Sequence, residues 1–209
     1  MKVLTLVGAV CAVAMVSASV SAQDKPVRVR GTIDQIEGTM MTVKSREGDT
    51  LRIKLADDGS VIALEKASLA DIKPNSYVGS TAMPHRDGTW KAVEVHIFPE
   101  AMRGTGEGDR PYDYRPQSTM TNGTVSNVGK STVGGTVSSE EGSTITLSYK
   151  DGSKKIELTP ETVIVRYLPG SREELKPGAR IYIPAATRQA DGTLMTARIN
   201  VGRGIAPPM

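Results

Sequence analysis

The 209-residue chain has a single cysteine, Cys11, and it lies within the apolar stretch near the N-terminus. The remaining sequence therefore offers no disulfide, no thiol nucleophile and no thiolate metal site. The excess of one sign of charge over the other is also small, because the formal net charge is only +3. Such a small excess gives little electrostatic attraction to nucleic acid or to anionic lipid.

Long hydrophobic runs are almost absent. Residues 3–16 form the one clear run, which is too short to span a membrane. Lys2 precedes it, and small residues at 17–22 follow it before the polar pair Gln23-Asp24. This order is typical of a cleavable signal peptide. We therefore predict a signal peptide over residues 1–22, a mature chain that begins at Gln23 without a transmembrane segment, and a periplasmic or secreted location.

Histidine is rare as well, with only His85 and His96. Hydrolytic catalysis needs a nucleophile beside a base, or paired carboxylates in a cleft. In the repeat described next, the positions matching the histidines are Arg188 and Asn200, and no carboxylate pair recurs. We expect no catalytic site and no enzyme activity.

What the chain does contain is an internal repeat, in which residues 29–98 align with residues 133–201. The matched segments are Gly31-Thr32-Ile33 with Gly135-Thr136-Val137, Met41-Thr42-Val43 with Ile145-Thr146-Leu147, Ser68 to Pro74 with Ser171 to Pro177, and Asp87-Gly88-Thr89 with Asp191-Gly192-Thr193. We therefore predict two domains, at 23–98 and 133–203. A linker rich in glycine and proline joins them at 99–132, and a tail follows at 204–209.

Each copy is predicted to consist mainly of short strands, because runs rich in β-branched residues alternate with glycine-bearing turns. Met41 and Val43 should point inward between outward-facing neighbours. Ser68 with Asp71, and Ser171 with Glu174, have the spacing of capping boxes and predict one short helix per copy. Three strands, a short helix and two strands is the order of an OB-like barrel. An SH3-like barrel or two packed sheets would give a similar pattern, so the firm prediction is an all-β fold, with two tandem five-stranded OB-like barrels preferred.

The pattern of the first copy, from Gly31-Thr32-Ile33 through the Ser68 to Pro74 segment to Asp87-Gly88-Thr89, resembles a family of small secreted bacterial OB-like domains of unknown function. The resemblance covers residues 29–98 well and 133–201 more loosely. The stretch from His96 to Gly104, with Met120-Thr121-Asn122, is similar to exported members of that family. The resemblance implies an OB-like fold and a periplasmic location, and it implies no activity.

The outward face of the second and third predicted strands is the candidate ligand-binding surface. Its residues are Met40, Thr42, Lys44, Arg52 and Lys54. Nucleic acid is the habitual ligand of OB barrels on this face, but no aromatic residue is present here to stack on bases. We therefore predict no nucleic-acid binding.

Methionine and histidine side chains raise a second hypothesis, because thioether sulfur suits Cu(I) and imidazole binds copper in either oxidation state. The candidate ligands are Met83, His85, His96, Met102 and Met120, all in the first copy or the linker. They form no dense motif. The preferred prediction is thus a non-enzymatic exported binding protein for an envelope protein, peptide or polymer, and the alternative is a periplasmic copper-binding protein.

Overall fold

The computed structural model describes residues 25–85, 88–130 and 142–207. Over these ranges the chain is all-β, as the sequence predicts. The strands are β1 (Val27–Glu37), β2 (Met40–Ser45), β3 (Thr50–Lys66), β4 (Tyr77–Pro84), β5 (Trp90–Ile97), β6 (Gly108–Pro111), β7 (Thr119–Lys130), β8 (Ser143–Tyr149), β9 (Gly152–Leu158), β10 (Val163–Pro169), β11 (Arg180–Arg188) and β12 (Leu194–Gly202). The predicted signal peptide and the predicted first mature residue, Gln23, lie outside the described residues.

Helix is limited, in these ranges, to three single turns of 3₁₀ helix: η1 (Leu69–Asp71), η2 (Glu100–Met102) and η3 (Arg172–Glu174). The predicted capping boxes are confirmed, with Ser68 and Asp71 framing η1 and Ser171 and Glu174 framing η3. No helix in the described part of the chain is both long enough and apolar enough to cross a membrane.

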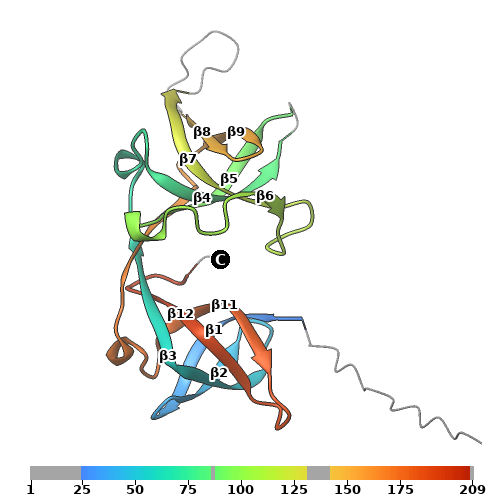
Figure 1. Cartoon of the computed structure of the whole chain (residues 1–209), viewed down its shortest axis with the longest axis vertical. Coiled ribbons are helices and arrows are strands. Elements are labelled where there is room, and N and C mark those ends of the chain that lie inside the picture. Colours follow the sequence, from blue (N-terminus) through green and yellow to red (C-terminus); the bar gives the residue numbers. More distant parts are fainter. Residues whose placement is uncertain (1–24, 86–87, 131–141, 208–209) are drawn as a thin grey trace, which may run out of the picture.

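Five strands form a closed barrel, which is the lower part of Figure 1. Its pairings run β12–β11–β1–β2–β3, and a parallel pairing of β3 with β12 closes the ring. Inward side chains from all five strands share one apolar core, which contains Val29, Ile33, Met41, Val43, Ile53, Leu55, Val61, Ala63, Leu175, Ile181, Ile183, Ala186, Leu194, Ile199 and Val201. The predicted inward orientation of Met41 and Val43 is confirmed.

Strands β4, β5, β7, β8 and β9 form a second ring of pairings, the upper part of Figure 1. A short parallel contact of β5 with β9, in which Trp90 lies opposite Ile156, closes this ring. Its core is separate from the first and contains Ile72, Val78, Ala82, Ala92, Val95, Val125, Ile145, Leu147, Ile156 and Leu158. Strand β6 pairs with β7 outside the ring.

The two halves of the chain exchange strands. The closed barrel takes β1, β2 and β3 from the first half and β11 and β12 from the second, while the second ring takes β4 and β5 from the first half and β7, β8 and β9 from the second. This arrangement differs from the predicted one, in which 23–98 and 133–203 would each close a barrel of their own. The physical reason is that β3 continues as a 17-residue strand instead of turning back, so the strands after it reach the other ring.

The crossing strands pair with each other where they pass between the rings. Ile62–Lys66 of β3 lie antiparallel to Val165–Pro169 of β10, on the left of Figure 1. The side chains buried around this crossing form a third cluster, here called the interface cluster: Leu64, Tyr77, Phe98, Met120, Val165, Tyr167 and Tyr182. Ile205, from the predicted tail, packs against it.

The predicted linker at 99–132 is corrected by the structure, because it contains η2, β6 and all of β7. Strand β7 pairs with β4 and with β8. Its register shifts after Val125 just as that of β1 shifts after Ile33, so Gly123-Thr124-Val125 holds the place of Gly31-Thr32-Ile33. The segment predicted for that place, Gly135-Thr136-Val137, lies outside the described residues. The alignment of the repeat matched Gly135-Thr136-Val137 because the same three residues, Gly-Thr-Val, occur both there and 12 positions earlier.

Candidate functional site

The five residues predicted to bind a ligand lie together on the outer face of the closed barrel. Thr42 is opposite Arg52, and Met40 is opposite Lys54, across β2 and β3. Lys44 and Arg52 are exposed, and the other three are half-buried. The structure therefore places these side chains on one continuous surface.

A basic cavity adjoins this surface. It has a volume of about 290 Å³ and is lined by β1, β2, β11 and the C-terminal segment. Four of its lining residues are cationic, namely Arg30, Lys44, Arg46 and Arg180, and the lining includes no carboxylate. Lys44 and Arg180 flank Thr32 because both lie opposite it on neighbouring strands. We call this the cationic pocket.

Three of the four cations are available to a ligand. Lys44, Arg46 and Arg180 are exposed, and none has a carboxylate partner within 4 Å among the described residues. Arg30 differs, because its Nη2 lies 3.4 Å from Oδ1 of Asp113. Like charges held together without counterions attract an anion, most strongly at low ionic strength.

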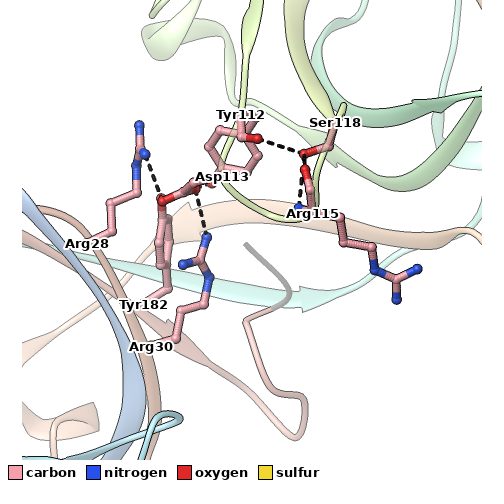
Figure 2. Close-up of polar contacts among 7 residues, drawn as sticks. All are labelled: Arg28, Arg30, Tyr112, Asp113, Arg115, Ser118 and Tyr182. Atoms are coloured by element: carbon pink, nitrogen blue, oxygen red, sulfur yellow. Dashed lines mark hydrogen bonds and ion pairs between the residues drawn. The ribbon is translucent and has the colours of Figure 1, made fainter.

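The fourth cation, Arg30, belongs to the contact between the closed barrel and the segment after β6. Figure 2 shows Asp113 between Arg28 and Arg30, with Arg28 Nη1 at 2.9 Å. Tyr112 and Tyr182 place their hydroxyl oxygens 3.0 Å apart. Burial by itself would raise the pKa of Asp113, but hydrogen bonds and charge from Arg28 and Arg30 outweigh it and lower that pKa.

The segment itself is held in shape by Ser118 (Figure 2). Its hydroxyl oxygen lies 2.8 Å from the carbonyl oxygens of both Tyr112 and Arg115, which share its single proton, and it accepts from the Arg115 N–H. The segment thus presents Tyr112 and Asp113 to the closed barrel from a locally fixed turn. It joins the two rings, and none of its residues lines the cationic pocket.

A patch of buried polar residues covers the side of the second ring that faces the crossing strands. Met120, Thr81 and Glu94 form one row across β7, β4 and β5, and Asn122, Gly79 and His96 form the next. The five side chains are all buried, and four of them are polar, Met120 being the exception. Gly79 is required here, because a Cβ at this position would overlap Nε2 of His96.

Glu94 and His96 are the most unusual members of this patch. They are only 1% and 2% exposed, and Oε1 of Glu94 lies 3.6 Å from Nδ1 of His96. That separation exceeds a hydrogen bond, and neither carboxylate oxygen nor Nδ1 has a hydrogen-bond partner in the described structure. Burial raises the pKa of Glu94, although His96 and Arg30 oppose the shift.

The structure separates the five predicted metal ligands into two groups. His96 and Met120 lie in the buried patch, and Met102 packs against the interface cluster. Met83 lies opposite Lys91, five residues before His96, or roughly 17 Å along the strand, and His85 is exposed beyond β4. Among the described residues, no three histidine, cysteine or carboxylate side chains are grouped so that they could hold a metal ion.

Sequence reasoning missed Arg30, Arg46 and Arg180 as lining residues, and Thr81 and Glu94 as polar members of the buried patch. The outward position of Arg30 follows from the alternation of β1 around Val29. Arg180 could not be found from the sequence, because strand exchange places β11 beside β1.

The chain matches no known family model, no curated protein and no solved structure. Its function is therefore inferred from its own residues and their arrangement.

Proposed function

We propose that this chain is an exported, non-enzymatic binding protein that is built from a duplicated OB-like domain and binds an acidic polymer of the cell envelope on the closed barrel. The observation that carries the proposal is the cationic pocket, in which Lys44, Arg46 and Arg180 line one cavity without a carboxylate. The signal-peptide pattern of residues 1–22 supports export.

A linear ligand is favoured over a small ion by how the charges continue beyond the pocket. Lys54 lies level with Met40 of β2, and Arg52 lies level with Thr42. Lys44 follows on β2, so these three cations recur about every 7 Å, the step of two residues in a strand, and Arg46 lies just beyond the end of β2. Arg52 is partly neutralised by Asp191, whose pKa is lowered mainly by hydrogen bonds from Thr193 and further by Arg52.

Weak individual contacts suit such a ligand. Each exposed ion pair contributes about 0.2–1 kcal/mol, so useful affinity needs several in series. Arginine also supports this role, because its planar guanidinium binds carboxylate, sulfate or phosphate oxygens in pairs. The absence of aromatic side chains among Met40, Thr42, Lys44, Arg52 and Lys54 disfavours nucleic acid as that polymer.

The proposal is tested with dextran sulfate as the probe and neutral dextran as the control. Light scattering or calorimetry at low salt should show binding of dextran sulfate only, and raising the ionic strength to 0.15 M should weaken it, because the Debye length falls to about 8 Å. The Lys44→Gln, Arg46→Gln, Arg180→Gln triple variant should bind about tenfold more weakly, from three lost pairs.

A matched control removes the same number of charges elsewhere. Lys73, Lys150 and Lys155 are exposed and form no ion pair in the described structure. Their triple Lys→Gln variant should bind dextran sulfate nearly as tightly as the wild type. Equal weakening of both triple variants would show that net charge alone attracts the polymer, and would refute a site on the closed barrel.

A further inference from the structure

Arg30 is the one cation of the cationic pocket that a carboxylate of the chain already holds. Its Nη2 donates to Oδ1 of Asp113 at 3.4 Å. The charge of Arg30 also acts on Glu94, but neither carboxylate oxygen of Glu94 has a hydrogen-bond partner in the described structure. Asp113 is therefore the carboxylate that a ligand has to replace in order to bind Arg30.

Arg30 lies on the same outer face of the closed barrel as the other cations. It is two residues before Thr32 on β1, so both side chains point outward, and their positions are about 7 Å apart. Thr32 has Lys44 opposite it on β2 and Arg180 opposite it on β11. The Arg46 N–H donates to the carbonyl oxygen of Arg30. A ligand that contacts the three free cations is thus one strand step from the fourth.

Asp113 holds Arg30 less closely than it holds Arg28 (Figure 2). Its Oδ2 lies 2.9 Å from Nη1 of Arg28, whereas the 3.4 Å to Arg30 is longer than an ordinary hydrogen bond. Nε of Arg30 has no hydrogen-bond partner in the described structure. The guanidinium also lies over the ring of Tyr182, 5.2 Å from its centroid, which holds it near the pocket without Asp113. An exchange at Arg30 therefore breaks one long contact and leaves the pair with Arg28 in place.

An anionic group of a ligand can offer Arg30 more than Asp113 does. A guanidinium binds two anionic oxygens in parallel, but Asp113 divides its two oxygens between Arg28 and Arg30. A polymer already bound at Lys44 and Arg180 presents its next anionic group at high effective concentration, because that group is tethered. The exchange then adds a contact without the loss of the earlier ones.

We propose that Arg30 is a fourth anion-binding residue of the cationic pocket, and that Asp113 is its built-in competitor, which the acidic polymer displaces from Arg30. This inference rests on the proposed polymer-binding function. Asp113 belongs to the segment that joins the two rings, so polymer binding on the closed barrel opposes one contact between them. Such coupling is reciprocal: loss of the contact strengthens binding by the same factor by which binding weakens the contact.

The test measures binding of dextran sulfate to full-length variants by calorimetry at low salt. Asp113→Asn keeps the size of the side chain and removes the competing charge, so it should bind about threefold more tightly than the wild type, which is the worth of one exposed ion pair. Glu161→Gln is the matched control, because it removes the same charge and frees Lys91, its partner at 3.2 Å on the second ring. This control should bind like the wild type.

A second substitution shows whether the gain passes through Arg30. Arg30→Gln should weaken binding, and Asp113→Asn added to it should give no gain beyond that of Glu161→Gln. Circular dichroism spectra like that of the wild type will show that each variant is folded. Equal binding by Asp113→Asn and Glu161→Gln, or an undiminished gain in the Arg30→Gln background, would overturn the exchange. Polymer binding itself would still stand if the wild type binds and the pocket's triple variant binds more weakly, so the two failures are distinct.

Discussion

At the scale of single residues, Asp113 has the clearest role in holding the two rings together. Its carboxylate accepts from Arg28 and Arg30 of β1, although it belongs to the segment that follows β6 (Figure 2). The side chain remains 46% exposed, so solvent screens these pairs and limits their contribution.

Replacing Asp113 by asparagine should lower the free energy of unfolding at pH 7 by about 1 kcal/mol or less. The pKa of Asp113 is lowered in the folded chain from its ordinary value of 3.8, so the stabilisation is complete above that pH and disappears as the pH falls through the folded pKa. Denaturation in urea at pH 7 and again near pH 2.5 should show a difference between variant and wild type that is smaller at the lower pH.

Asp58→Asn is the control for that prediction, because Asp58 is exposed and has no ion pair in the described structure. This variant should leave the free energy of unfolding unchanged at both pH values. An Asp113→Asn effect that persists unchanged near pH 2.5 would mean that the side chain acts by packing and not by charge.

At the scale of elements, the long strand β3 decides how the chain is routed. It belongs to the closed barrel along its first part, and its last residues pair with β10. Between these parts its register against β12 shifts, from Leu55 opposite Thr196 to Ser60 opposite Arg198. Arg172, the first residue of η3, donates from Nη2 to the carbonyl oxygens of Ala56, Asp57 and Gly59 at 2.8–3.2 Å.

Arg172→Ala should therefore destabilise the protein by about 1–2 kcal/mol, because carbonyl groups at the irregular part of β3 lose a charged donor. Amide hydrogen exchange should become faster mainly at residues 56–60. Lys176→Ala, an exposed cation four positions away, serves as the control and should leave both quantities unchanged. Uniformly faster exchange across the closed barrel would instead indicate a general loss of stability.

At the scale of the whole molecule, strand exchange makes the two cores depend on each other. Each core contains strands from both halves, and the crossing strands bury Leu64 and Val165 between them. Neither half can keep its own core if the other unfolds. We therefore expect one cooperative unfolding transition for the described fold.

The only tryptophan, Trp90, makes this expectation measurable, since it lies in the second ring and reports on that ring alone. Ile53 is fully buried in the closed barrel, and Ile53→Val should cost about 0.5–1.5 kcal/mol. Its denaturation midpoint should fall equally by Trp90 fluorescence and by far-ultraviolet circular dichroism. Ile156→Val in the second ring should behave in the same way, and a fluorescence midpoint unmoved by Ile53→Val would show independent rings.

The sequence by itself determined the local structure. Alternation placed Met41 and Val43 inside, and the Ser68–Asp71 and Ser171–Glu174 spacings located the helical turns, because these features depend on neighbours within a few positions. It also placed Met40, Thr42, Lys44, Arg52 and Lys54 on one face, because strands joined by a short hairpin pair with each other.

Only the tertiary structure decided which half completes which ring. The matched segments of the two halves offer similar edges, so local pattern does not distinguish pairing within a half from pairing between halves. The exchange then places Arg180 of β11 across β1 from Lys44 of β2 to form the cationic pocket, and it stacks Tyr167 of β10 on His96. The cationic pocket joins Lys44 and Arg180, which lie far apart in the chain, and proximity of that kind arises from packing and not from sequence spacing.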